Sequence, residues 1–143
     1  MTGEMQLIDT NILVHAYTVS DEKKHRVALP IVEKVWAGEE AATALQNLCE
    51  FFFVVTRKVS KPISVTAAEA TVEAILASSR WRVIDRKPET VREAIELVKV
   101  NRVPFWDALI AASMLEHGIN TIVSENEPDF KRVPGISAIN PFK

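Results

Sequence analysis

Short apolar segments alternate with longer segments of helical periodicity along the whole chain, and this alternation constrains the fold more than any other feature. The short apolar segments, each of a length typical of buried strands, are residues 5–8, 41–44, 81–84, 121–123 and 136–139. The longer segments carry apolar residues three and four positions apart, and they include residues 21–37, 45–59, 88–100 and 105–117. Strands that alternate with helices predict an α/β sandwich with a mostly parallel central sheet of four to five short strands flanked by helices.

Local signals predict where two of the helices begin. Thr10 or Asn11 is expected to cap a helix that follows the first strand, because either side chain can accept a hydrogen bond from a free backbone N–H. The segment from Thr66 to Glu69 has the spacing of a capping box. The sequence therefore predicts helix starts near residues 10 and 66.

Size and charge limit the class of protein. With 143 residues, 48% of them hydrophobic, the chain is expected to form a single domain over residues 1–143. The formal net charge is -2 and the 17 basic residues are scattered, so composition alone does not indicate nucleic-acid binding. No apolar run reaches the roughly 18 residues that cross a bilayer, and the N-terminus lacks a basic segment before a long apolar run. We therefore expect a soluble, cytoplasmic protein.

The cysteine and tryptophan residues are first interpreted as structural. Cys49 is the only cysteine, which excludes an internal disulfide and a thiolate metal cluster, and its apolar helix suggests a packed, inert thiol. Trp36, Trp81 and Trp106 lie within or beside apolar runs. We expect them in the core or in an interface rather than as platforms for nucleotide bases.

Asp9 is a charged residue directly after the first apolar segment. In parallel α/β sheets, functional sites gather at the carboxyl ends of the strands, which is where Asp9 is expected to lie. The same position also suits a residue that merely caps a helix or forms a turn. Both interpretations of Asp9 remain open from this residue alone.

Three further acidic residues stand where the predicted fold can bring them near Asp9. Asp107 lies in the first turn of an apolar helix, with its carboxylate directed toward a buried face, which favours a functional role. Glu50 belongs to a polar stripe on another helix, which alone is an ordinary solvated surface. Asp129 lies in the loop SENEPDF, which follows a strand candidate.

The four acids together predict a metal site. Carboxylates that converge without a cation repel one another and raise one another's pKa, so such a cluster makes sense mainly around a divalent ion. Oxygen ligands without His or Cys favour Mg²⁺ or Mn²⁺ over Zn²⁺. These ions typically catalyse chemistry at phosphoryl groups.

The motifs in their order along the chain resemble one known family. LIDTNILVHA, the mid-chain Glu50, FWDALIAA, SENEPDF and VPGISAINPF are together similar to the PIN-domain ribonucleases, especially the VapC-type toxins of VapBC toxin-antitoxin systems, over essentially the whole chain. The resemblance implies a three-layer PIN-like sandwich. It also implies that the catalytic, metal-binding acids are Asp9, Glu50, Asp107 and Asp129.

The resemblance assigns further positions around these acids. Asn126 stands where many members have another Asp, so it would be a weak, uncharged metal ligand. Thr10, Asn11 and Ser124 match polar positions that orient the acids. The implied activity is Mg²⁺- or Mn²⁺-dependent hydrolysis of RNA phosphodiester bonds. The implied partners are an RNA substrate, a small cognate antitoxin protein and a second copy of the chain in a homodimer.

An acidic pocket repels phosphate, so basic residues at its rim are expected to assist RNA binding. The candidates, each of which is more simply a solvated surface charge, are Arg57, Lys58, Lys61, Arg86, Lys87, Arg102 and Lys131.

Alternatives to a toxin remain open. One is a free-standing PIN nuclease of RNA processing, and another is a PIN-like RNA-binding protein with weak or lost catalysis, which Asn126 favours slightly. A third is a phosphate-transfer receiver or phosphatase in which Asp9 accepts phosphate. The third has little support, because the residue two positions after Asp9 is Asn11 rather than a second Asp.

Overall fold

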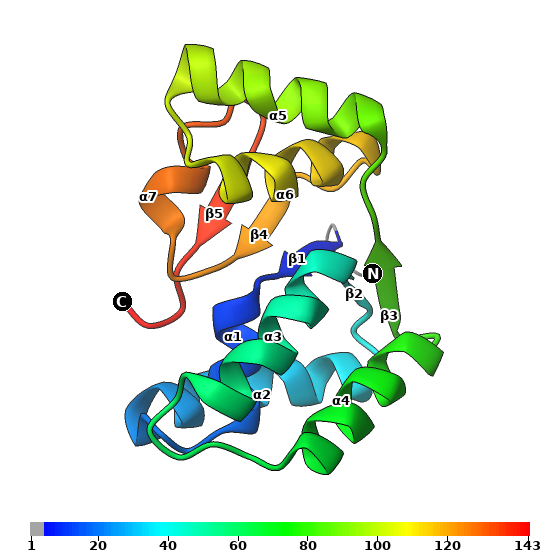
Figure 1. Ribbon diagram of the computed structural model, residues 1–143, viewed down its shortest axis with the longest axis vertical. Helices are drawn as coiled ribbons and strands as arrows, with labels where there is room; N and C mark the ends of the chain where they lie inside the picture. Colours follow the sequence, from blue (N-terminus) through cyan, green and yellow to red (C-terminus); the bar gives the residue numbers. More distant parts are fainter. Residues whose placement is uncertain (1–4) are drawn as a thin grey trace.

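The computed structural model describes residues 5–143 and is built around one parallel β-sheet (Figure 1). The strands are β1 (Gln6–Ile8), β2 (Ala41–Ala44), β3 (Trp81–Ile84), β4 (Thr121–Val123) and β5 (Ser137–Ile139). They lie in the order β3-β2-β1-β4-β5, and every neighbouring pair is parallel. The predicted α/β class with a parallel sheet of short strands is confirmed.

Helices cover both faces of the sheet and complete three layers (Figure 1). One layer contains α1 (Thr10–Tyr17), α2 (Glu22–Trp36), α3 (Leu45–Arg57) and α4 (Val65–Ala77). The other contains α5 (Pro88–Asn101) and α6 (Phe105–Glu116), with the short α7 (Glu127–Phe130) after β4. Adjacent residues of β1 pack against opposite helical layers: Leu7 belongs to the core beneath α5 and α6, and Ile8 belongs to the core beneath α1 to α4. This alternation explains why β1 is apolar at successive positions.

The path of the chain through the sheet determines where a site can form. From β1 the chain proceeds outward to β2 and β3, and it then returns to place β4 on the opposite side of β1. This reversal makes a topological switch point between β1 and β4, where the loops after the two strands separate toward opposite layers. Asp9 follows β1 and Ser124 follows β4, so both residues flank the switch point.

The helices begin near residues 10 and 66 as predicted, but the predicted capping residues are wrong by one or two positions. Asp9, rather than Thr10 or Asn11, is the N-cap of α1, and its Oδ1 accepts a hydrogen bond from the Thr10 backbone N at 2.9 Å. Ser64, rather than Thr66, caps α4 and accepts from the Ala67 N–H. In both cases an earlier side chain of a good capping type is available, and the helix begins there.

The expectation for Cys49 is also wrong, and the expectation for Trp106 is wrong as far as the core is concerned. Cys49 is exposed on α3 rather than packed. Trp81 is buried, as expected, with 3% of its surface exposed, but Trp106 is 58% exposed and is not a core residue. Helix α6 buries its apolar residues from Ala108 onward, and Trp106 precedes that buried stretch. Among residues 5–143, no helix is both long and apolar enough to cross a bilayer.

Candidate active site

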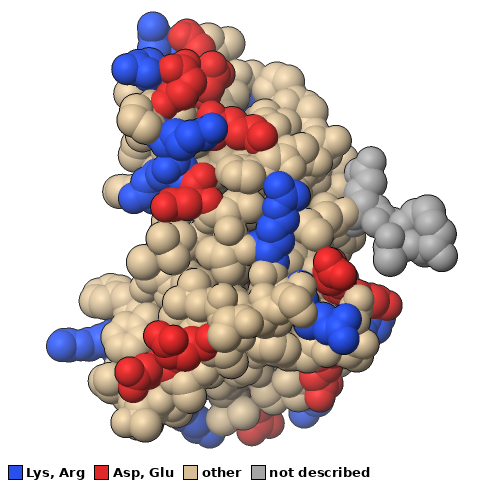
Figure 2. Space-filling model, turned by 90° about the vertical axis from the view of Figure 1, so that its right-hand side faces the viewer, with Lys and Arg blue, Asp and Glu red and all other residues tan. Residues whose placement is uncertain are grey.

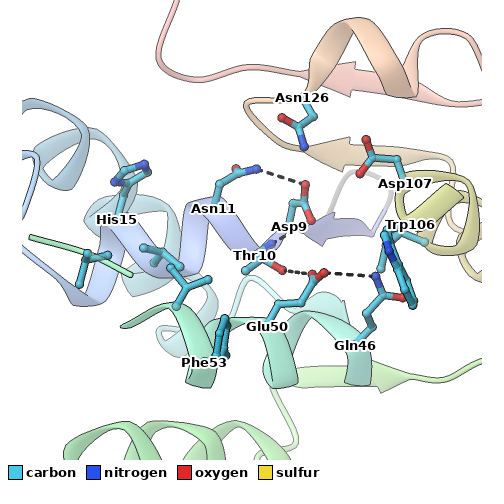
Figure 3. A pocket seen from close by; sticks show the side chains of 14 residues that line it. Asp9, Thr10, Asn11, His15, Gln46, Glu50, Phe53, Trp106, Asp107 and Asn126 are labelled. Carbon is cyan, nitrogen blue, oxygen red and sulfur yellow. Dashed lines mark hydrogen bonds between the residues drawn. The ribbon is translucent and has the colours of Figure 1, made fainter. Parts of the chain in front are cut away.

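Three of the four predicted acids, Asp9, Glu50 and Asp107, line a cavity of about 550 Å³ at the carboxyl edge of the sheet. Asp9 comes from the end of β1, Glu50 from α3, Asp107 from α6 and Asn126 from the loop after β4. In Figure 3, Asp9 lies between Asp107 and Asn126 on one side and Glu50 on the other. The two helical layers and the sheet therefore each contribute to one site.

Asp9 is buried and held by several donors. Ser124 Oγ donates to its Oδ2 at 2.6 Å, and Asn47 Nδ2 donates to its Oδ1 at 3.0 Å. Asn11 Nδ2 also lies 3.3 Å from Oδ2. Burial raises the pKa of Asp9 above its ordinary value, while the hydrogen bonds from Ser124 and from the Thr10 backbone oppose that rise. Asp9 is thus both the cap of α1 and a fixed, partly desolvated carboxylate, so its two interpretations do not exclude each other.

Asn47 is a site residue that the sequence-based prediction missed. Its side chain is fully buried, and its Nδ2 donates to Asp9 and, at 2.9 Å, to Thr10 Oγ1. Its Oδ1 accepts from the Ala44 backbone N at 2.9 Å, which fixes the amide. The sequence signal was a polar residue three positions before Glu50 on a mostly apolar helix.

Thr10 joins α1 to Glu50. Its Oγ1 donates to Glu50 Oε1 at 2.9 Å, and Gln46 Nε2 lies 3.5 Å from Glu50 Oε2 (Figure 3). Because the Thr10 hydroxyl also accepts from Asn47, one short network connects Asp9 to Glu50 through neutral side chains. Such a network holds two carboxylates near one cavity without a direct contact between them.

Asp107 also has a raised pKa. Burial and the negative charges of Asp9 and Asp129 raise its pKa from 3.8 to about 7, with a smaller contribution from Glu50. The side chain is half-buried and faces the cavity. Without a cation, this carboxyl therefore keeps its proton to a higher pH than an ordinary aspartate does.

The loop after β4 is tied directly to the first helix. Ser124 is buried, and its Oγ accepts from the Asn126 backbone N at 2.9 Å while donating to Asp9. The Glu125 backbone N donates to Asn11 Oδ1 at 3.1 Å. Asn11 and Ser124 thereby hold the loop that carries Asn126 against the start of α1.

Two other acids of this loop are neutralised away from the cavity. Glu125 pairs with Lys24 and lies 3.3 Å from His15 Nε2. Glu127 pairs with Lys131 at 2.9 Å and with Lys143 at 2.7 Å, and these cations lower its pKa. These ion pairs hold the backbone in place on either side of Asn126.

Asp129 and Asn126 differ in their relation to the cavity. Asn126 lines it, whereas Asp129 does not, although Asp129 lies close enough to Asp107 for its negative charge to raise the Asp107 pKa. Within residues 5–143, no three acidic, His or Cys side chains are placed to share one metal ion as they stand.

The donor set nevertheless fits a hard divalent cation. The polar side chains among the lining residues offer carboxylate, amide and hydroxyl oxygens, and the one histidine among them, His15, is turned toward Glu125. Burial and, after it, the negative charges of Asp9 and Asp129 raise the Asp107 pKa, and a bound cation would oppose both effects. Oxygen ligands of this kind match Mg²⁺ or Mn²⁺.

Comparison with known proteins agrees with this architecture. The family model for the PIN domain matches residues 7–136. No curated protein sequence is significantly similar to the chain. A toxin-antitoxin complex from Klebsiella pneumoniae is similar in fold, with a TM-score of 0.64 at 19% identity over 95% of this chain and 97% of that chain.

Two further solved structures share the fold. VapC20 of Mycobacterium tuberculosis, described as a toxin that cleaves the sarcin-ricin loop, gives a TM-score of 0.61 at 22% identity over 81% of this chain and 85% of its own. DNA-bound VapBC from Salmonella typhimurium gives 0.66 at 20% identity over 97% of this chain and 99% of that chain. With the family model spanning most of its length, the chain belongs to the PIN domain family.

Proposed function

We propose that the protein is a metal-dependent endoribonuclease that hydrolyses RNA phosphodiester bonds and is the toxin of a type II toxin-antitoxin pair. The observation that supports this most strongly is the convergence of Asp9, Glu50 and Asp107 on one cavity, where burial and the neighbouring acids raise the pKa of Asp107 to about 7. A structural role does not require three carboxylates from three separate elements at one place.

The residues that would hold the metal are Asp9, Glu50, Asp107 and Asp129, with Asn126 as a weak neutral ligand. A bound Mg²⁺ or Mn²⁺ would lower the pKa of water and neutralise charge on the leaving oxygen. Since the acids are not yet gathered around one point, ion binding would require at least one side chain to change rotamer. Glu50, which is held only by Thr10 and Gln46, is the side chain that we expect to turn.

The neutral residues have supporting roles in this proposal. Ser124 and Asn47 fix both oxygens of Asp9 and oppose its protonation. Asn11 holds the loop of Asn126 in place. Residues that orient metal ligands in this way commonly change metal affinity when they are substituted.

The proposed partners follow from the similar structures. Some of these are toxin-antitoxin complexes, and we propose a small antitoxin protein as the partner of this chain too. VapC20 is described as cleaving the sarcin-ricin loop, which supports structured RNA as a substrate class. We further propose a homodimer that acts in the cytoplasm.

The test is RNA cleavage by the purified protein with Mn²⁺, with Mg²⁺ and with EDTA. We expect cleavage only with a divalent ion, leaving a 5′-phosphate and a 3′-hydroxyl. Glu50→Gln should abolish it, whereas Glu73→Gln, which alters an exposed glutamate of α4, should not. Equal cleavage by both variants would show that Glu50 is not required for the activity. Folded protein that binds RNA without cleaving it would support the binding-protein alternative.

A further inference from the structure

A second cavity of about 430 Å³ adjoins the acidic one. Glu50, Gln46 and Trp106 line both cavities, so the two are neighbours across these side chains. The second cavity is completed by Leu45, Cys49, Asp85 and Arg86. A substrate bound at the acids would therefore lie next to a second cavity, which is lined by the indole of Trp106 and the guanidinium of Arg86.

Trp106 is placed to contact a ligand rather than to support the fold. It is 58% exposed, and Phe105, with which it makes an edge contact at 5.1 Å between ring centres, is also exposed. The indole lies beside Gln46 in Figure 3, at the edge of the acidic site. An exposed indole offers a flat apolar face on which a nucleotide base can stack.

Arg86 supplies positive charge at the same cavity. Its Nη1 donates to Gln46 Oε1 at 3.3 Å, and it forms no ion pair with any residue of the described chain, 5–143. Its charge is therefore free to pair with a phosphate. Figure 2 shows acidic and basic side chains interspersed on one face of the molecule, so local cations matter more than a broad basic surface.

The opposite rim of the acidic cavity repeats this pairing. Phe53 lines the cavity, is 54% exposed, and has Lys58 Nζ 5.5 Å from its ring centre. An aromatic ring with a nearby cation thus stands on either side of the acids. This alternation is typical of surfaces that follow a single nucleic-acid strand, where rings stack on bases and cations contact phosphates.

We propose that Trp106 and Arg86 form a base-stacking subsite for an unpaired nucleotide next to the scissile phosphate, with Trp106 against the base and Arg86 on the adjoining phosphate. The proposal rests on the nuclease function, since it assumes an RNA strand at the acids. The subsite requires RNA that is single-stranded at the cleavage point, because a base stacked inside an RNA duplex cannot reach the indole.

The test measures binding rather than cleavage. Tryptophan fluorescence of the purified protein is titrated in the cold with a single-stranded octauridylate in Mg²⁺, and gels confirm that the probe stays intact. We expect quenching with wild type and with Trp36→Phe, a matched change on α2 away from both cavities. Trp106→Phe should lose most of the quenching. Trp106→Ala should weaken binding by about 5- to 150-fold, as the loss of one stacked base does.

The arginine is tested through salt dependence. Arg86→Gln should lower the slope of log Kd against log salt by about 0.7, the value for one phosphate contact on a single strand. Arg82→Gln, an exposed arginine on the same strand β3, should leave the slope unchanged. A blunt RNA duplex should cause no quenching in any variant.

Unchanged quenching in Trp106→Phe, or unchanged affinity in Trp106→Ala, would overturn the subsite. If Trp106→Ala instead dissociates a dimer in sedimentation and leaves RNA affinity intact, the surface is a protein contact and the proposal is wrong. Quenching without cleavage would support the subsite and reject the nuclease. Cleavage together with RNA binding that neither the Trp106 nor the Arg86 substitutions change would support the nuclease function and reject the subsite.

Discussion

Replacing Asp107 by Asn should stabilise the metal-free protein at neutral pH. The folded protein raises the pKa of Asp107 from 3.8 to about 7, so the folded state binds a proton that the unfolded state has lost. Unfolding free energy therefore falls as pH rises from about 4 and levels off above about 7. The full shift corresponds to about 4 kcal/mol. Because the side chain is half exposed, solvent screening reduces this to about 1–2 kcal/mol.

The assay is thermal unfolding in EDTA at pH values from 4.5 to 8. Asp107→Asn should melt close to wild type at pH 4.5 and about 2–8 °C above it at pH 8. Glu73→Gln, at an exposed glutamate, controls for the general loss of a negative charge. With saturating Mn²⁺ at pH 8, wild type should instead melt at a higher temperature than Asp107→Asn, since the ion stabilises the charged carboxylate of Asp107. A difference between Asp107→Asn and wild type that does not change with pH would refute this reasoning.

Two other substitutions test the surroundings of the acids. Ser124→Ala removes the hydroxyl that donates to Asp9 at 2.6 Å, so it should raise the Asp9 pKa further. The variant should lose about 1–2 kcal/mol of unfolding free energy. Calorimetry should show Mn²⁺ binding that is weaker by about 10- to 100-fold. Ser79→Ala, at an exposed serine, should do neither, and equal effects of the two would show that Ser124 does not act through Asp9. Asn126→Asp should lower the Mn²⁺ concentration that supports half-maximal RNA cleavage, and Mn²⁺ should support wild type better than Mg²⁺. Identical metal titrations for wild type and Asn126→Asp would show that position 126 does not tune the site.

The sequence was sufficient to predict the sheet and the general position of the site. Strands of three or four mostly apolar residues are recognisable because helices of clear periodicity separate them. The rule that sites lie at strand ends placed Asp9 and the loop from Ser124 at one edge, as the structure has them.

The details that were missed depend on packing between distant elements. Asn47 resembles a surface residue by its position in a polar stripe, and only the approach of α3 to the β1 end buries it against Asp9. Trp106 lies in the first turn of a helix that is apolar nearly all round, so periodicity cannot show that this turn extends past the core. Helix α7 has four residues, which is too short for a periodic signal.

The most direct test of the central claim is calorimetric titration of Mn²⁺ into wild type and Asp9→Asn at neutral pH. Asn at position 9 keeps the shape of the side chain and can still cap α1, so the fold should survive while a ligand charge is lost. We predict a saturable Mn²⁺ site in wild type that is weakened at least about tenfold in a normally folded Asp9→Asn protein. Equal Mn²⁺ affinity in the two proteins, or no Mn²⁺ binding to wild type, would contradict the assignment of these acids as a metal centre.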